Sequence, residues 1–138
     1  MNKIIDRFYV GDWNDAQSLK QSNPNEISSV LNVCENIDDL PAVAYLHAAF
    51  KDHETIPKDK FDLCMIWLNT QYSANRTILV HCALGVSRSP TICAAFLTKL
   101  QVAANIDAAL TLVRSARPQV NPAPLTWASA KEYLNGTS

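Results

Sequence analysis

Short apolar runs rich in β-branched and aromatic residues alternate along the chain with longer segments of helical periodicity. Runs of this kind, closed by glycine or polar residues, are typical of strands that pack in a protein core. The stretch TILVH is the most strand-like of them. The predicted strands cover residues 7–11, 26–34, 43–50 and 77–81.

The intervening segments place apolar residues three or four positions apart, which predicts helices with one face on the core. The segment 89–100 is apolar on nearly every face and is therefore expected at the centre of the fold. Four further helices are predicted. The first covers 14–21, with Asn14 or Asp15 near its cap, and the second begins at Pro57, with Phe61, Met65 and Leu68 facing in. The third covers 105–118, with Asn105 as its cap and Ile106, Leu110 and Val113 on one stripe. The last follows Pro124, with Trp127, Ala130 and Leu134 facing in, and ends at Asn135-Gly136.

Strands that alternate with helices indicate βαβ units, so the pattern predicts an α/β fold. We expect a single domain over residues 1–138, with a mainly parallel sheet of four or five strands and helices on both faces. In such folds ligands bind beyond the carboxyl ends of the strands. Two predicted strands end there in reactive groups, because 77–81 runs into Cys82 and 43–50 runs into Asp52.

Composition narrows the class of protein. The chain has 138 residues, of which 48% are hydrophobic and 18% are charged, as in globular proteins. A formal net charge of −1 gives no broad basic surface, so neither nucleic acid nor a membrane surface is an expected partner. The sequence shows no secretory signal and no apolar stretch long enough to span a bilayer.

The four cysteines have no CxxC pair and no histidine at zinc spacing, so neither a metal site nor a cofactor is expected. Without a secretory signal, reduced thiols and a cytoplasmic location are the simplest interpretation. Cys34, Cys64 and Cys93 lie in apolar runs and are interpreted first as core residues. Cys82 lies instead in a polar loop.

That loop, HCALGVSRSP, combines a nucleophile with the features of an anion-binding site. Backbone amides of a tight loop that opens a helix converge on one point, where the helix dipole favours negative charge. Gly85 allows close approach of the backbone, and Arg88 can place its planar guanidinium on two phosphate oxygens. A cysteine in this field is expected as the reactive thiolate. Together these groups meet the needs of phosphoryl transfer to sulfur.

HCALGVSRS resembles the H-C-x-x-G-x-x-R-S loop of the cysteine-dependent protein phosphatases, in particular their dual-specificity branch. RFYVGDWNDA, SSVLNVCEN and AALTLVRSARP are similar to further segments of that family, so the resemblance covers most of the chain. It implies that Cys82 attacks phosphorus and that water then hydrolyses a cysteinyl-phosphate. The phosphate-binding loop would comprise Ala83, Leu84, Gly85, Val86, Ser87 and Arg88.

The implied mechanism needs an acid that protonates the leaving oxygen and then acts as a base. Asp52 matches the family's acid-loop position and is the candidate. Asp59 and Asp62 are rivals that are better interpreted as charges near the start of a helix. Glu54 is less well placed, and His47 and His53 are interpreted as structural or solvent-facing.

Two neighbours of the loop each have two interpretations. Ser89 either caps the following helix or donates a hydrogen bond to the departing thiolate, and both roles are compatible. His81 is expected to orient the loop through its ring N–H groups rather than to shuttle protons.

Three residues raise questions within the resemblance. Leu84 stands where the family often has alanine, so it either shapes the pocket rim or points away. Ala123 stands where asparagine is common, which predicts the loss of a supporting hydrogen bond to the loop. Cys34 is a candidate redox partner of Cys82, with a buried core thiol as the alternative.

The uncharged loop residues Ala83, Leu84 and Val86 favour a phosphorylated protein as substrate, with phosphotyrosine and also phosphoserine or phosphothreonine as targets. A phosphoinositide or an RNA 5′-triphosphate would call for additional cations in the loop. Rivals from other classes are a phosphate-binding pseudophosphatase and a rhodanese-like sulfurtransferase. Because the predicted site is complete in one chain, we expect a monomer.

Overall fold

The computed structural model describes residues 1–136. Strands and helices are mixed along the chain as the sequence predicts, but they do not strictly alternate, since the first and second strands follow each other directly, as do the third and fourth, and three helices follow the last strand. Five strands join in one sheet. The strands are β1 (Asn2–Ile5), β2 (Phe8–Gly11), β3 (Ser29–Asn32), β4 (Ala44–His47) and β5 (Ile78–His81).

All five predicted helices form, within a few residues of their expected bounds. Pro57 precedes the second helix, and Ala130 is buried in the last one, with Trp127 and Leu134 packed on the core. The helices are α1 (Trp13–Ser18), α2 (Lys58–Ser73), α3 (Arg88–Lys99), α4 (Ile106–Ala116) and α5 (Pro124–Gly136). None of these described helices combines the length and apolar character that crossing a bilayer requires.

The sheet has the strand order β1-β2-β5-β3-β4, with only the β1–β2 pairing antiparallel. The expectation of a mainly parallel α/β sheet is therefore confirmed. Strand β1 was not predicted, because its four residues NKII are half-buried or exposed and carry no clear period. Arg7, at φ 62°, makes the tight turn that brings β1 back along β2.

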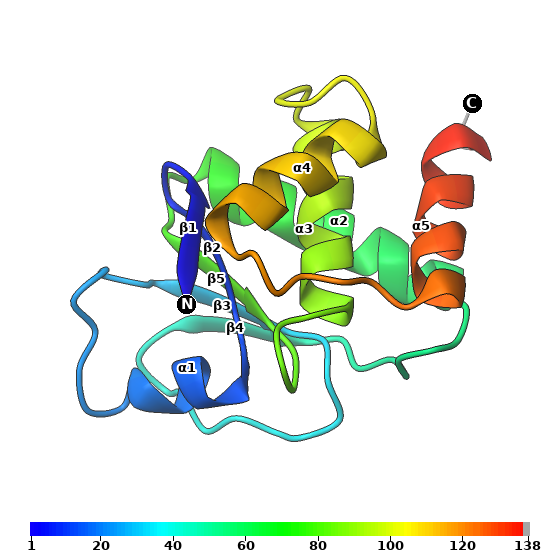
Figure 1. The fold of residues 1–138 in the computed structure, drawn as a ribbon. Coiled ribbons are helices and arrows are strands. Elements are labelled where there is room, and N and C mark those ends of the chain that lie inside the picture. Colours follow the sequence, from blue (N-terminus) through cyan, green and yellow to red (C-terminus); the bar gives the residue numbers. More distant parts are fainter. Residues whose placement is uncertain (137–138) are drawn as a thin grey trace.

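Helices cover both faces of the sheet, but unequally (Figure 1). Helix α1 lies alone on one face, and α2 to α5 cover the other. The alternation of side chains along β5 follows these layers. Leu79 packs in the smaller cluster beneath α1, whereas Ile78 and Val80 belong to the main core.

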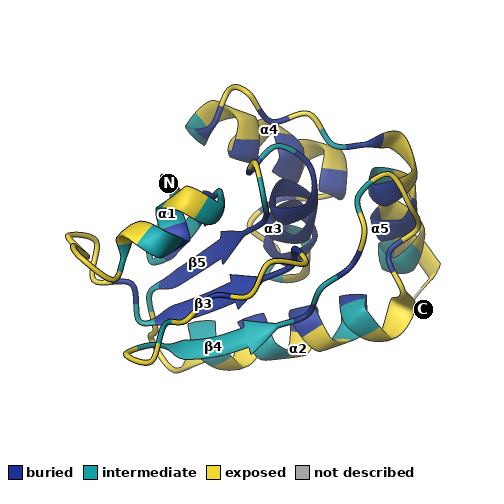
Figure 2. Cartoon of the chain, turned by 90° about the horizontal axis from the view of Figure 1, so that it is seen from below, coloured by how far each residue is buried: buried dark blue, intermediate teal, exposed yellow. Residues whose placement is uncertain are grey.

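Helix α3 is the central helix, as its apolar sequence predicts. Its first ten residues are all buried between the sheet and the neighbouring helices (Figure 2). In the same view β3 and β5 are buried, whereas β4 at the sheet edge is only half-buried. The loop that opens α3 is thereby fixed on the best-packed part of the molecule.

One expectation about helix caps is confirmed, since Asp15 lies near the cap of the first helix, and another is wrong. The N-cap of α1 is Asp12, and Asp15 stands three residues later, where its carboxylate accepts from the Asp12 amide in a reciprocal capping box. Helix α3 begins at Arg88 behind Ser87, so Ser89 lies inside the first turn and does not cap it. Its hydroxyl contacts the Cys82 sulfur and the Gly11 carbonyl oxygen instead.

Candidate active site

The loop between β5 and α3 leaves the carboxyl end of the central strand, where ligands bind in parallel α/β folds. Residues 82–87 form this loop, with Gly85 in its middle at φ 67°. A Cβ atom at Gly85 would lie 2.7 Å from Arg117 Nη2 and 2.8 Å from the Gly11 carbonyl oxygen. Both the backbone conformation and the space therefore require glycine.

The carbonyl oxygens of loop residues 83 to 87 are all engaged by donors from the surrounding structure. Trp13 donates to Ala83, Arg117 to Leu84 and Gly85, Asn121 to Val86, and Thr91 to Ser87. With the carbonyl groups held from outside, the peptide amides are left to face an anion bound within the loop.

The sulfur of Cys82 lies at the base of the loop and is almost fully buried. The amide of Gly85 donates to Sγ at 3.3 Å, and Ser89 Oγ lies 3.2 Å from the same atom. Ser89 also donates to the Gly11 carbonyl oxygen at 3.2 Å. The hydroxyl proton of Ser89 can therefore be donated either to the Gly11 carbonyl oxygen or to the Cys82 sulfur, and it is donated to the sulfur when the sulfur is negatively charged.

Arg88 is buried at the first position of α3 and is held in place by one nitrogen. Nη1 donates to Glu35 Oε1 at 2.7 Å and to the Phe50 carbonyl oxygen at 3.0 Å. Within the described residues these are the contacts of its guanidinium, so Nη2 and Nε remain for phosphate oxygens.

Asp52 follows β4 and lies in the same pocket as Cys82 and Arg88. Its Oδ1 accepts from Ser87 Oγ at 2.7 Å and from Thr126 Oγ1 at 3.3 Å. His53 Nε2 lies 3.5 Å from Oδ2. These contacts come from the loop, from α5 and from the neighbouring residue, so the carboxylate is held from several sides.

Ser87 also ties the loop to the segment before α5. The backbone amide of Ala123 donates to Ser87 Oγ at 2.8 Å. This hydrogen bond comes from the main chain and does not depend on the side chain at position 123, so the predicted loss of a side-chain bond there stays a prediction.

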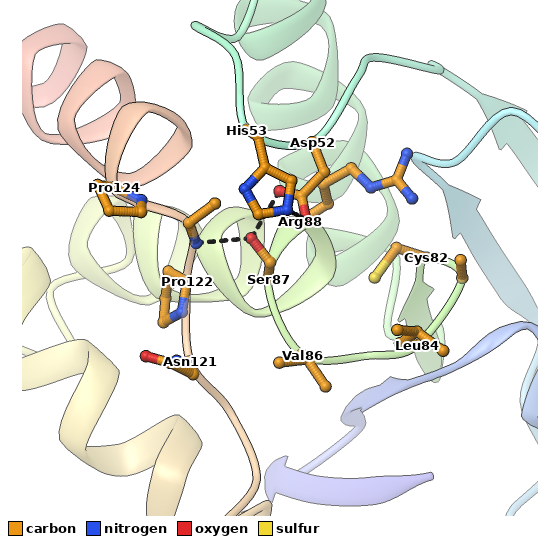
Figure 3. Close-up of a pocket in the computed structure, with 12 residues that line it drawn as sticks. Asp52, His53, Cys82, Leu84, Val86, Ser87, Arg88, Asn121, Pro122 and Pro124 are labelled. Atoms are coloured by element: carbon orange, nitrogen blue, oxygen red, sulfur yellow. Dashed lines mark hydrogen bonds and ion pairs between the residues drawn. The ribbon is translucent and has the colours of Figure 1, made fainter.

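The loop, Asp52 and the segment 121–124 enclose a cavity of about 310 Å³ (Figure 3). Leu84 lines its mouth with 73% of its surface exposed, so of its two interpretations the rim position is the one found. Among the residues that line the cavity, Arg88 and His53 are the ones whose side chains can carry a positive charge. His53 also faces solvent.

His81 precedes the nucleophile and is completely buried. Its Nδ1 lies 3.3 Å from the Cys82 carbonyl oxygen, and its Nε2 lies 2.5 Å from Asp38 Oδ2. Burial alone would lower the pKa of His81, but the hydrogen bond to Asp38, with help from Cys34, raises that pKa to about 9. The ring thus contacts the loop backbone on one side and, on the other, a buried carboxylate that the sequence did not reveal.

All four cysteines are free, buried thiols. Burial raises the pKa of Cys64 to about 12 and that of Cys93 well above its usual value, so both are inert core residues. Cys34 donates to Asn32 Oδ1 at 3.1 Å and lies just beyond β3. Among residues 1–136 no group of three or more His, Cys, Asp or Glu side chains is placed to hold a metal ion.

The rival acids lie elsewhere. Asp59 is exposed in the first turn of α2, and Asp62 pairs with Lys58 at 3.2 Å on the same helix. Glu54 offers only its carbonyl oxygen, to Thr126. None of the three lines the cavity.

A comparison with protein families decides the relationship. The family model described as "Dual specificity phosphatase, catalytic domain" matches residues 8–135. The chain belongs to this family. The site residues that resemble the family's loop therefore lie in a fold and a sequence context of the same family.

Two relatives illustrate the range of similarity. Human dual specificity protein phosphatase 22 is 30% identical over 125 residues, which cover 88% of this chain and 67% of the relative. Mouse dual specificity protein phosphatase 15 is 28% identical over 126 residues, or 90% of this chain and 53% of the relative. The chain thus spans about half the length of several dual specificity phosphatases that it matches.

The fold agrees with solved structures of the family. The crystal structure of human DUSP28 superposes with a TM-score of 0.87 at 22% identity and covers all of both chains. The crystal structure of DUSP15 gives a TM-score of 0.84 at 26% identity, over 95% of this chain and 85% of that one.

Three charged residues of this dual specificity phosphatase domain were missed in the sequence. Glu35 pairs with Arg88, Asp38 pairs with His81, and Arg117 holds the loop carbonyls. Glu35 and Asp38 sit in a polar segment between strands that gives no signal of its own. Arg117 was quoted within a similar segment, but its target is visible only in the fold.

Proposed function

We propose that the chain is a phosphomonoester hydrolase that acts on phosphoproteins through a cysteinyl-phosphate on Cys82. This proposal rests on one observation: Cys82, Arg88 and Asp52 line the same cavity, and the carbonyl oxygens of the loop beside them are bound by donors from the surrounding structure. Membership of the dual specificity phosphatase catalytic domain family supports the same reaction. Because the relatives are longer, the activity of the whole protein is part of the proposal.

In the first step, the thiolate of Cys82 attacks phosphorus while the loop amides and Arg88 hold the phosphate oxygens. The negative charge that develops on those oxygens in the transition state meets donors already in place. Asp52 gives its proton to the leaving oxygen, which makes an alcohol or phenol the leaving group.

In the second step, Asp52 takes a proton from water, which attacks the cysteinyl-phosphate. The sulfur leaves as a thiolate and accepts from the Gly85 amide and from Ser89, whose hydroxyl lies 3.2 Å away. Phosphate and the free enzyme are the products. No metal or cofactor enters either step.

The lining of the cavity favours a phosphorylated side chain of a protein over more highly charged substrates. Ala83, Leu84 and Val86 supply apolar walls, and Arg88 is the one guanidinium among the lining residues. A phosphoinositide or an RNA 5′-triphosphate carries further phosphates that would need further cations. Phosphotyrosine, and with it phosphoserine or phosphothreonine, fits this lining.

The first test is hydrolysis of p-nitrophenyl phosphate as a function of pH. We expect no turnover by Cys82→Ser, and a loss of about 10²- to 10⁴-fold together with the basic limb of the profile for Asp52→Ala. Asp62→Ala, which removes an acid outside the cavity, is the matched control and should keep the wild-type rate. Full activity of Cys82→Ser would refute the mechanism.

The rival functions are tested with the same protein. Binding of vanadate without turnover would identify a pseudophosphatase, and sulfur transfer from thiosulfate would identify a sulfurtransferase. A panel of phosphotyrosine, phosphoserine and phosphothreonine peptides beside phosphoinositides then ranks the substrates within the superfamily.

We also propose that Cys34 is a redox partner of Cys82. The two residues follow neighbouring strands, since Asn32 of β3 pairs with His81 of β5. Peroxide would oxidise the Cys82 thiolate to a sulfenic acid, and the Cys34 thiol would then displace hydroxide to form a disulfide, with water as the product. We expect a thiol reductant to restore peroxide-treated wild type but not Cys34→Ser, and equal recovery of both proteins would contradict the pairing.

Finally, we propose that the protein acts in the cytoplasm as a monomer. The four free thiols suit a reducing compartment, and the residues proposed for catalysis all come from one chain. Light scattering of the purified protein and fractionation of cells test these two points.

A further inference from the structure

The ring of His81 lies between two hydrogen-bond acceptors. Nδ1 faces the carbonyl oxygen of Cys82 at 3.3 Å, and Nε2 faces the carboxylate of Asp38 at 2.5 Å. A neutral imidazole has one N–H and would turn a lone pair toward one of these oxygens. Because the hydrogen bond to His81 lowers the pKa of Asp38 against the opposing effect of burial, its carboxyl is ionised, and only the imidazolium, with two N–H groups, then satisfies both contacts.

Asp38 is itself fixed by neutral groups. Gln17 of α1 donates to its Oδ1, and its backbone amide donates to Tyr45 Oη at 3.3 Å. The amide of Asn32 donates to the same Tyr45 oxygen at 3.0 Å. The carboxylate therefore reaches His81 from a rigid setting that joins α1, β3 and β4.

No other charge compensates this carboxylate. Both side chains of the pair are completely buried, and among residues 1–136 no lysine or arginine makes an ion pair with Asp38. The other titratable groups that face the pair are Cys34, which contributes to the pKa of His81, and Tyr45, whose own pKa is raised by burial. A buried carboxylate requires a positive partner, and His81 is the one available.

We propose that Asp38 is a positioning residue that keeps His81 as an imidazolium behind the nucleophile. The inference rests on the proposed function, since it concerns how that same site forms its thiolate. The Nδ1–H group of His81 fixes the peptide that carries Cys82 and places a positive charge 3.3 Å from the Cys82 carbonyl oxygen. The negative charge of Asp38 lies beyond Nε2, at the opposite end of the ring from the Nδ1 contact with the Cys82 carbonyl oxygen.

The direct test is Asp38→Asn, which keeps the shape and an acceptor oxygen but removes the charge. With His81 neutral, the positive charge beside the peptide that carries Cys82 is lost. We expect alkylation of Cys82 by iodoacetamide at pH 6, followed on its peptide by mass spectrometry, to slow about 10-fold, as a shift of one pH unit implies. The kcat/KM for p-nitrophenyl phosphate at pH 6 should fall equally, and both rates should approach wild type at pH 8.

Asp39→Asn is the matched control, because this neighbouring carboxylate is exposed. It should leave both pH profiles unchanged. In a His81→Gln background, Asp38→Asn should have no further effect on the alkylation midpoint, whereas a merely structural role would still lower the rates. An unchanged midpoint for Asp38→Asn would overturn the proposal.

Nitrogen NMR of His81 in the wild-type protein gives a reading that needs no variant and no activity. Two protonated ring nitrogens at pH 7.5 are expected, and a neutral tautomer would overturn the proposal even if Asp38→Asn fails to fold. The NMR and alkylation results also separate the two levels of inference. An inactive protein with a charged His81 would refute the phosphatase function and leave the histidine assignment standing.

Discussion

At the scale of single residues, Ser87 connects parts of the site that lie far apart in the sequence. One hydroxyl donates to Asp52 and accepts from the amide of Ala123. The hydroxyl thus positions the proposed acid and satisfies a buried backbone group. The sequence places Ser87 only in the phosphate-binding loop. Its contacts with Asp52 and Ala123 are visible only in the structure.

We expect Ser87→Ala to lower both activity and stability. The Ala123 amide loses its acceptor, which costs about 1 to 3 kcal/mol of unfolding free energy for a buried donor. Asp52 keeps its longer bond to Thr126 and its contact with His53, so kcat should fall by about 10-fold, less than the roughly 10²- to 10⁴-fold expected when the acid itself is removed. Urea denaturation and kcat measurements check this, with Ser115→Ala on the exposed face of α4 as control. A stability loss with unchanged kcat would contradict the link to the acid.

At the scale of elements, the phosphate loop keeps its shape because α1, α4 and the 121–124 segment each hold part of it. Arg117, directly after α4, donates to the carbonyl oxygens of Leu84 and Gly85. Its Nη1 also donates to Asn2 Oδ1 at 2.9 Å. The loop conformation is thus fixed by elements from both ends of the chain.

We expect Gly85→Ala to damage the loop. The left-handed backbone and the close contacts with Arg117 and Gly11 should cost about 1 to 3 kcal/mol. The Gly85 amide would also move away from the Cys82 sulfur. We expect this to lower kcat/KM by more than about 10-fold, because removing one preorganised donor from an enzyme active site costs at least that much. Calorimetry and turnover of p-nitrophenyl phosphate measure the two effects.

Gly136→Ala is the matched control, because a Cβ atom there has no neighbour within 4 Å. It should leave stability and activity unchanged. If Gly85→Ala behaved like Gly136→Ala, the loop would be more adaptable than its contacts indicate.

The elements themselves could be predicted from local pattern, but their partners could not. The residues TILVH and the apolar run of α3 show clear strand and helix patterns, and both elements form where they are predicted. The residues of β1 show no such pattern, so this strand was missed. Cys82, Arg88 and Gly85 could be found because loop chemistry is local in sequence. Asp38 and Glu35 meet His81 and Arg88 only when β3 lies beside β5, and no spacing encodes that contact.

At the scale of the whole molecule, the buried His81–Asp38 pair couples stability to pH. The pKa of His81 is raised to about 9 in the folded protein, and that of Asp38 is lowered by its bond to His81 despite the opposing effect of burial. The histidine contribution is complete below about pH 6.5 and is lost as the pH rises toward 9. The aspartate contribution is present above about pH 4 and is lost in acid.

We therefore expect the free energy of unfolding to be highest between about pH 4 and 6.5 as far as this pair is concerned. It should fall by a few kcal/mol between pH 6.5 and 9. Urea denaturation at several pH values checks the slope, and Asp38→Asn should flatten it while Asp39→Asn should not. A wild-type slope unaffected by Asp38→Asn would show that other groups determine it.

The contact between Arg117 and Asn2 has a consequence for the order of events during synthesis. A ribosome releases the amino-terminal strand early, and residue 117 must emerge from the exit tunnel before the arginine can grip the phosphate loop. Until then the carbonyl oxygens of Leu84 and Gly85 lack the donor that holds them in the folded protein. A nascent or truncated chain that ends before Arg117 therefore carries Cys82 without these two contacts, and we expect the loop to reach its final shape only as the last helices fold into place.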